Sequence, residues 1–258
     1  MKKKTRLLFF LLALSHLAFY CSPSNNFVVL HQVTGPIETN CYLLYDIRSK
    51  EAALFDVGGP IDSLITHINN NNLILKYIFA THCHMDHIES VSMIREKFPG
   101  ALLCYNKEDY ENFLISIEWI EKNWDPKELA EMKKDPVLRK WFDYDLSIFG
   151  EPDIYLEDNQ IYKLGNLKIQ TYLSPGHSIG SICYYAGDVL FSGDVLFYRR
   201  VGRIDLLGGS NEAMTQSVRR LYDCLPDETK VYPGHGQFTF IGTEKKENEE
   251  VTIDSVNL

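Results

Sequence analysis

Short runs of apolar and β-branched residues recur between residues 27 and 232, and Gly, Pro or Asn residues bound several of them. Runs of this length and composition are typical of β-strands. We predict nine strands, at 27–30, 41–45, 52–56, 77–80, 102–105, 167–172, 181–185, 189–191 and 230–232. Apolar residues at helical spacing predict helices over 211–225 and 88–98. Strands in series with interspersed helices indicate an α+β class with a large sheet content.

Residues 106–150 follow a different pattern, because their apolar side chains are spaced like one face of a helix. The spacing is carried by Phe113, Ile117, Ile120 and Trp124. Asp-Pro pairs at 125–126 and 135–136 resemble helix starts, with an N-cap residue followed by a first-turn proline. All three tryptophans of the chain lie in this segment. We expect a helical insertion around 106–150 that either roofs a pocket with aromatic side chains or only packs onto the body.

The N-terminus has the composition of an export signal. Residues 2–6 carry four positive charges and no acid, and residues 7–20 are apolar apart from a serine and a histidine. This apolar run is too short for a comfortable membrane span and suits a signal peptide over 1–20. Cys21 follows directly, which resembles a bacterial lipoprotein signal whose cysteine is lipidated. We expect an exported protein, either periplasmic or membrane-anchored as a lipoprotein, with plain secretion or an uncleaved anchor as the alternatives.

The remaining composition is that of an ordinary globular domain with an acidic surface. The chain carries 26 basic and 35 acidic side chains, a net charge of −9, which becomes more negative once the basic N-terminus is removed. Because nucleic-acid binding requires a positive footprint, we expect a small-molecule substrate and no nucleic acid. No repeat or low-complexity linker interrupts 27–243, so residues 27–258 are predicted to form one domain.

The strongest chemical signal is the segment 81–87, Thr-His-Cys-His-Met-Asp-His, directly after the predicted strand at 77–80. In an extended segment, residues two apart project to the same side, so His82 and His84 can bind one ion together. Asp86 and His87 turn with the next helix and can face a second position. Imidazole and carboxylate ligands suit zinc, iron or manganese.

Three further candidate ligands stand where other strands end. His177 and His235 lie in Pro-Gly-His turns after the strands at 167–172 and 230–232, and Asp194 follows a Ser-Gly pair after the strand at 189–191. A rigid sheet presents side chains at such positions to a common cleft. The remaining histidines, at 16, 31 and 67, have no such setting.

Taken together, this order of His and Asp residues resembles the metallo-β-lactamase superfamily. More narrowly, the chain is similar to short, single-domain glyoxalase II-like hydrolases of the hydroxyacylglutathione hydrolase type. The matching stretches are 39–44, 55–59, 192–197, 202–205 and 232–236. The resemblance implies the metallo-β-lactamase fold, a four-layer αβ/βα sandwich of two facing sheets with helices outside.

Carried over residue by residue, the resemblance implies two divalent metal ions, zinc first, with iron or manganese as alternatives. One metal would be held by His82, His84 and His177, and the other by Asp86, His87 and His235, with Asp194 bridging. Asp56 would accept a hydrogen bond from a ligand imidazole and fix its orientation. Asp86 and Asp194 are the candidate catalytic residues, because either carboxylate could orient the nucleophile.

Two departures from the glyoxalase II pattern bear on the substrate. Glu89 and Ser90 stand where relatives usually carry small residues. We also expect no counterpart of the C-terminal helical domain that classical glyoxalase II uses to hold glutathione. Arg199 and Arg200 are candidate contacts for an anionic substrate group, with solvated surface side chains as the alternative. Arg203 is instead expected to pair with Asp205 as a structural clamp.

The leading hypothesis is a binuclear metallohydrolase that cleaves a thioester or related acyl substrate with a metal-bridging hydroxide. The first alternative is a mononuclear iron persulfide dioxygenase. Residues 81–84, Thr-His-Cys-His, closely resemble the motif of that family. A second alternative is a non-catalytic, metal-stabilised surface binding protein. A damaged ligand set would favour that reading, and none of the seven candidate ligands is replaced.

Overall fold

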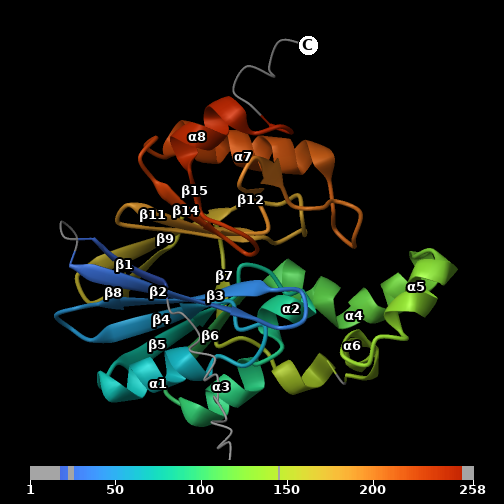
Figure 1. The fold of residues 1–258 in the computed structure, drawn as a ribbon, viewed down its shortest axis with the longest axis horizontal. Helices are drawn as coiled ribbons and strands as arrows, with labels where there is room; N and C mark the ends of the chain where they lie inside the picture. Colours follow the sequence, from blue (N-terminus) through green and yellow to red (C-terminus); the bar gives the residue numbers. More distant parts are fainter. Residues whose placement is uncertain (1–17, 23–25, 145, 252–258) are drawn as a thin grey trace, which may run out of the picture.

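The computed structural model describes residues 18–22, 26–144 and 146–251 of the chain. Two sheets lie face to face, with helices on the outer side of each (Figure 1). This arrangement is the predicted four-layer αβ/βα sandwich, and the fold expectation is therefore confirmed.

The first sheet has seven strands in the order of the chain. Neighbouring strands are antiparallel from β1 to β4 and parallel from β4 to β7. The strands are β1 (Ala18–Ser22), β2 (Phe27–Thr34), β3 (Thr39–Asp46), β4 (Glu51–Phe55), β5 (Ile74–Phe79), β6 (Leu102–Asn106) and β7 (Ile154–Leu156). Helices α1 (Asp62–Asn70) and α3 (Val91–Lys97) cover its outer face, and the short α2 (Met85–Ile88) precedes α3.

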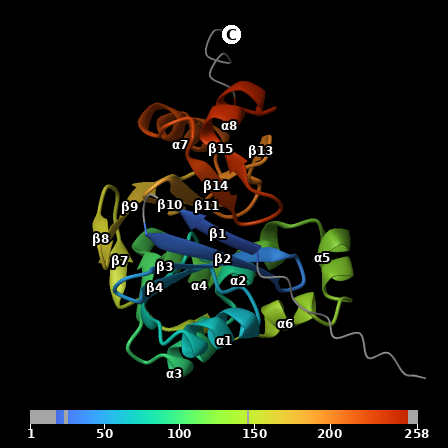
Figure 2. The same ribbon diagram turned by 60° about the vertical axis from the view of Figure 1, so that its left-hand side comes forward.

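The second sheet has six strands in the order β15-β14-β11-β10-β9-β8. These strands are β8 (Ile161–Leu164), β9 (Leu167–Leu173), β10 (Ile182–Ala186), β11 (Val189–Gly193), β14 (Lys230–Pro233) and β15 (Thr239–Phe240). A small hairpin, β12 (Leu196–Phe197) and β13 (Arg200–Val201), follows β11. Helices α7 (Asn211–Cys224) and α8 (Ile241–Glu247) cover the outer face (Figure 2).

Three apolar clusters fill the three spaces between the four layers. The central cluster lies between the sheets, where the rings of Phe55 and Phe191 stack 4.0 Å apart at an interplanar angle of 10°. The outer clusters join α1 and α3 to the first sheet and α7 and α8 to the second. Each fully buried Phe or Leu contributes about 1.5–3 kcal/mol relative to an exposed one, so these clusters fix the sheets as a rigid frame.

The predicted helical insertion is present as α4 (Lys107–Asn123), α5 (Pro126–Met132) and α6 (Leu138–Asp143), followed by the 3₁₀ turn η1 (Leu146–Phe149). Asp125 caps α5, since its Oδ1 accepts hydrogen bonds from the backbone N–H groups of Lys127 and Glu128. Asp135 likewise accepts from two backbone N–H groups at the start of α6. The three helices lie together at one side of the sandwich (Figure 1).

The predicted signal peptide over 1–20 lies largely outside the described residues. Its described end belongs to β1, which runs antiparallel to β2 and contains Cys21. Among the described residues, no helix has the length and apolar character that crossing a membrane requires. Export and lipidation of Cys21 stay predictions.

Candidate metal centre

The seven candidate ligands are gathered where four segments leave the two sheets. His82 and His84 follow β5, and Asp86 and His87 lie in α2. The other three come from the second sheet, with His177 after β9, Asp194 after β11 and His235 after β14. Five of the seven residues are less than a tenth exposed, and the other two, His84 and His235, line the pocket floor, so the sheets hold the set in a common, largely water-excluded place.

The first group of three consists of imidazoles. The distances between their ring nitrogens are 3.0 Å from His82 Nε2 to His84 Nδ1, 3.2 Å from His82 Nε2 to His177 Nε2, and 2.9 Å from His84 Nδ1 to His177 Nε2. Ligands of a tetrahedral zinc ion at 2.0–2.1 Å lie about 3.3 Å apart. The three nitrogens therefore have the spacing of one coordination shell.

The second group of three combines a carboxylate with two imidazoles. Asp86 Oδ2 lies 3.1 Å from His87 Nε2 and 3.2 Å from His235 Nε2. The Asp86 carboxylate is fixed by a 3.1 Å hydrogen bond from the hydroxyl of Thr39.

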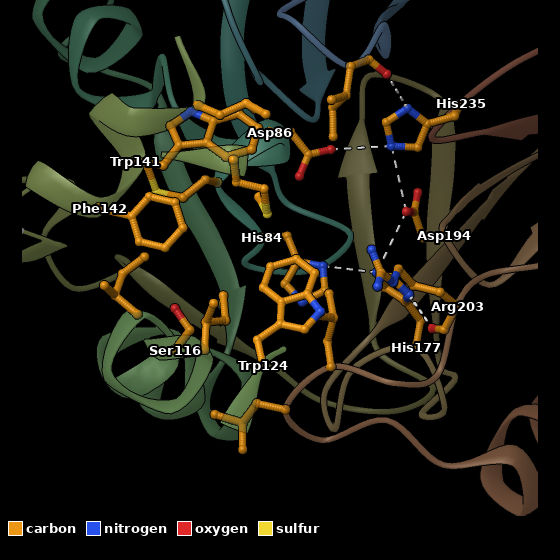
Figure 3. A pocket seen from close by; sticks show the side chains of 18 of the residues that line it. His84, Asp86, Ser116, Trp124, Trp141, Phe142, His177, Asp194, Arg203 and His235 are labelled. Carbon is orange, nitrogen blue, oxygen red and sulfur yellow. Dashed lines mark hydrogen bonds and ion pairs between the residues drawn. The ribbon is translucent and has the colours of Figure 1, made fainter. Parts of the chain in front are cut away.

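Asp194 lies between the two groups (Figure 3). Its Oδ1 is 3.4 Å from His87 Nε2, and its Oδ2 is 3.6 Å from both His177 Nε2 and His235 Nε2. Since the two oxygens of one carboxylate face ligands of different groups, Asp194 has the position of a bridge.

Several nitrogen and oxygen atoms of the cluster have lone pairs that could bind metal ions. His87 Nε2 and Asp194 Oδ1 are buried and have no hydrogen-bond partner among the described residues. Such orphaned buried atoms cost about 1–3 kcal/mol each unless a partner is present. Three imidazole nitrogens that converge within 3.2 Å also need a cation between them. The residues present therefore fit a divalent metal centre, and the cluster suits zinc or iron.

The opposite ring nitrogen of four of the histidines is held by an acceptor, which fixes each tautomer. His177 Nδ1–H donates to the Arg203 carbonyl (2.7 Å), and His235 Nδ1–H donates to the Ile37 carbonyl (3.1 Å). With Nδ1 protonated, the lone pair of the neutral ring lies on Nε2 and points into the cluster.

Asp56 orients the other two histidines from beneath the cluster. Its Oδ2 accepts hydrogen bonds from His87 Nδ1–H (2.9 Å) and from the Thr81 hydroxyl (2.9 Å), and its Oδ1 accepts from the Thr81 N–H (2.8 Å). The Thr81 oxygen in turn accepts from His82 Nδ1–H at 3.0 Å. The predicted role of Asp56 as the acceptor for a ligand imidazole thus matches the geometry, and Thr81 extends it to a second histidine.

Burial and neighbouring charges set the protonation of the imidazoles. Burial lowers the pKa of His84 and that of His177 to about 4, so both rings are neutral near pH 7. Burial also lowers the pKa of His87, but the carboxylates of Asp86, Asp56 and Asp194 outweigh it and raise that pKa well above the usual value. Neutral rings are the form that ligates metals.

Three glycines leave the space into which the cluster fits. A Cβ at Gly58 would lie 1.4 Å from the Asp86 carbonyl oxygen, and one at Gly202 would lie 1.8 Å from the Asp194 carbonyl oxygen. A Cβ at Gly234 would lie 2.1 Å from Asp194 Oδ1. No side chain can be accommodated at these positions without moving a candidate ligand.

A pocket of about 500 Å³ opens over the cluster, a volume typical of small-molecule sites. His84, Asp86, His177, Asp194 and His235 form its polar floor. The opposite wall is apolar and comes mainly from the insertion, with Trp124, Trp141 and Phe142 facing the floor (Figure 3). The tryptophans at 124 and 141 thus roof a pocket, whereas Trp119 does not line it.

Two of the arginine candidates, Arg199 and Arg200, lie outside this pocket, and their contact with the substrate stays a prediction. Neither lines the pocket. The Arg199 guanidinium pairs with Glu247 in α8, and Arg200 is exposed on the β12–β13 hairpin. Arg203 does line the pocket, and it pairs with Asp205 through two hydrogen bonds of 2.6 and 2.7 Å, as expected.

Two acidic side chains hold the site together through contacts that the sequence did not predict. Asp109 in α4 is buried and accepts hydrogen bonds from the backbone N–H groups of Cys83 (2.6 Å) and Gly180 (3.1 Å), so it joins two ligand loops. Glu89 accepts hydrogen bonds from Trp141 and Tyr144 of the insertion. The signal of Asp109 was weak, because an acidic residue early in a helix is common without any tertiary contact. Glu89, which follows the end of α2, was visible only as a departure from the glyoxalase II pattern.

Comparison with known proteins agrees with this fold and cluster. Residues 34–235 match the family model described as "Metallo-beta-lactamase superfamily". This chain is therefore a member of the metallo-β-lactamase superfamily of metal-dependent hydrolases.

Among its relatives is the probable metallo-hydrolase YqgX of Bacillus subtilis, which is 32% identical over 83% of this chain and 92% of its own length. Hydroxyacylglutathione hydrolase GloC of Haemophilus influenzae is 30% identical over 82% of this chain and 92% of its own. The chain thus has the size of its single-domain relatives.

Three solved structures are also similar. The B3 metallo-β-lactamase BLEG-1 is 32% identical, with a TM-score of 0.67 over 86% of this chain and 98% of that one. ETHE1 from Myxococcus xanthus is 26% identical, with a TM-score of 0.65 over 86% and 83%. TTHA1623, solved in a di-iron-bound form, is 28% identical, with a TM-score of 0.65 over 85% and 98%.

Proposed function

We propose that this protein is a binuclear metallohydrolase that cleaves a thioester or a related acyl substrate. The observation that carries the proposal is the position of Asp194, whose two carboxylate oxygens face both groups of ligands. One group is His82, His84 and His177, and the other is Asp86, His87 and His235. Hydroxyacylglutathione hydrolase GloC, a thioesterase by its name, supports the same reaction class.

A bound metal pair would supply Lewis acidity for the substrate carbonyl and lower the pKa of a water molecule towards neutrality. The protein's own contribution is to hold His84 and His177 as neutral imidazoles and to orient the carboxylates. Asp86, fixed by Thr39, and Asp194 both have oxygens at the pocket floor, where either can accept a hydrogen bond from the attacking water. The apolar wall opposite excludes other water and strengthens these polar interactions.

The persulfide dioxygenase alternative differs in its metal count. It requires one iron and leaves the second group of ligands without a role. Similarity to ETHE1 of Myxococcus xanthus keeps this alternative in view. The complete second group, with the orphaned His87 Nε2, favours the hydrolase. The open pocket that lies directly over the cluster disfavours a purely structural metal site.

Elemental analysis of the protein purified without chelator tests the metal centre. We expect two zinc, iron or manganese ions per chain, and one ion or fewer after His235→Ala. His67→Ala is the matched control, because His67 lies in α1 and outside the cluster, and it should retain both ions.

A thioester screen and an oxygen-uptake assay then separate the two enzymes. Thiol release that disappears in Asp194→Asn supports the hydrolase. One iron per chain with persulfide-dependent oxygen uptake would establish the dioxygenase instead. A protein that takes up no metal on reconstitution would refute both.

We also propose that the chain is exported and acylated at Cys21. The support is the sequence of basic residues 2–6, apolar residues 7–20 and the cysteine that follows. Intact-mass measurement of the membrane fraction should show a diacylglyceryl modification that Cys21→Ser removes. An unmodified chain that starts at Met1 would refute the proposal.

A further inference from the structure

The insertion helices α5 and α6 bury none of their residues in a core. Their apolar side chains are nevertheless half-buried, because they face the pocket. The residues concerned are Met132, Leu138, Trp141 and Phe142, joined by Ile117, Ile120 and Trp124 at the α4 side. We call these seven residues the apolar wall. The Trp141 side chain also packs against the core of the first sheet. Apolar helix faces that turn to a cavity are typical of sites that receive an apolar ligand.

The charges at the pocket do not suit a substrate with free carboxylates. Of the described residues that line it, Arg203 is the only lysine or arginine. Its guanidinium is already paired with Asp205 and lies over the ring of Trp124, 5.6 Å from the centroid. The acidic lining residues, Asp86 and Asp194, belong to the cluster. A tripeptide thiol such as glutathione, which carries two carboxylates, finds no uncommitted cation here.

The apolar wall is also tied to the metal motif. Glu89 follows α2 directly, and its carboxylate accepts hydrogen bonds from Trp141 Nε1–H and the Tyr144 hydroxyl, both at 3.2 Å. Because α2 carries Asp86 and His87, this contact sets the distance between the wall and the ligands. These two hydrogen bonds explain why a glutamate stands at position 89, where the glyoxalase II pattern has a small residue.

We propose that the substrate carries a long or bulky hydrocarbon acyl group, which binds against the apolar wall while its carbonyl lies at the His and Asp cluster. This inference rests on the proposed acyl hydrolysis and names its substrate class. The hydrocarbon covers the half-exposed aromatic side chains, and the thiol or alcohol portion points towards the pocket mouth.

A binding measurement tests the wall without catalysis. S-alkyl thioethers of N-acetylcysteamine, from ethyl to octyl, resemble acyl thioesters but cannot be hydrolysed. They are titrated into full-length protein freed of metal, with tryptophan fluorescence and calorimetry as readouts. Each buried methylene tightens binding up to about fourfold, so octyl should bind about 100-fold or more tightly than ethyl. Equal affinities for ethyl and octyl would overturn the inference.

A kinetic series with the metal-loaded enzyme tests the acyl preference. Release of N-acetylcysteamine from acetyl to octanoyl thioesters is followed by chromatography, with S-lactoylglutathione for comparison. We expect kcat/KM to rise with chain length and to exceed that for lactoylglutathione. Phe142→Ala should lower kcat/KM for the octanoyl substrate at least tenfold more than for the acetyl substrate. Leu114→Ala, exposed on α4 and outside the pocket, is the matched control and should keep the wild-type profile.

The outcomes separate this inference from the proposed function. Preference for lactoylglutathione, or equal loss on all substrates in Phe142→Ala, overturns the apolar acyl group while hydrolysis stands. Chain-length-dependent thioether binding without cleavage of any thioester refutes the hydrolase and leaves the apolar ligand site supported.

Discussion

Replacement of Asp56 by Asn tests whether the cluster depends on a carboxylate that does not itself face the metal position. Asp56 accepts three hydrogen bonds, two from Thr81 and one from His87. An Asn side chain has one acceptor and one donor group. Whichever way it is oriented, its NH₂ group faces a donor that the wild-type carboxylate satisfies. The imidazole of His87 then loses its fixed tautomer, or the loop at Thr81 shifts.

The magnitude follows from these lost bonds. Mutation of a residue that orients a metal-ligating histidine lowers metal affinity about 10–100-fold, which corresponds to about 1.4–2.7 kcal/mol. Asp56 is 2% exposed, so the opposed donor also costs about 1–3 kcal/mol of folding free energy. We therefore expect Asp56→Asn to fold, to be less stable, and to bind zinc 10–100-fold more weakly than wild type.

Competition against a chromophoric chelator measures the zinc affinity, and urea unfolding of the metal-free protein measures stability. Asp46→Asn is the matched control, because Asp46 is also 2% exposed and accepts bonds from the N–H groups of Arg48 and Ser49. It lies at the far end of β3, about 23 Å along the strand from Thr39. It should lose stability and keep its zinc affinity. Equal zinc affinities for Asp56→Asn and wild type would refute the reasoning.

Two further substitutions and one labelling experiment test other parts of the structure. Gly234→Ala, whose Cβ would lie 2.1 Å from a cluster carboxylate, should abolish metal binding by elemental analysis, whereas Gly100→Ala, with open space around its Cβ, should not. Glu89→Ala leaves the Trp141 N–H without its acceptor and should destabilise by about 1–3 kcal/mol in urea unfolding and speed amide exchange in α6; unchanged exchange would contradict the proposed tie. Iodoacetamide at pH 8 should label the exposed Cys224 before the four buried thiols, with peptide mass spectrometry as the readout, and faster labelling of a buried thiol would contradict the packing.

Most of the sheet framework could be predicted from the sequence, because central strands bury both faces and therefore read as continuous apolar runs. All nine predicted strands overlap observed ones. The missed strands, such as β7, β8 and β15, are short and lie near sheet edges, where exposed positions dilute the apolar pattern. The predicted helix over 88–98 is interrupted, because the Ser90 N–H bonds to the Val57 carbonyl instead of continuing α2.

The convergence of the seven candidate ligands was predictable because they lie just beyond strand ends, and strand ends of a packed sandwich converge. The positions of the arginine side chains were not predictable, because the direction in which a side chain leaves a loop depends on contacts that sequence spacing does not encode. Arg199 turns to an acid in α8, a helix that begins more than forty residues later in the chain. The tie from Glu89 to the insertion was hidden for the same reason.

The division of the cluster between the two sheets imposes an order on how the protein matures. His82, His84, Asp86 and His87 are translated well before His177, Asp194 and His235. At about 5–20 residues per second, about 7–30 s separate synthesis of His87 from that of His235. During this interval the nascent chain offers an incomplete set of donors, to which any available cation binds only weakly. A metal ion that needs ligands from both sheets could therefore be fully coordinated only after the second sheet has packed against the first.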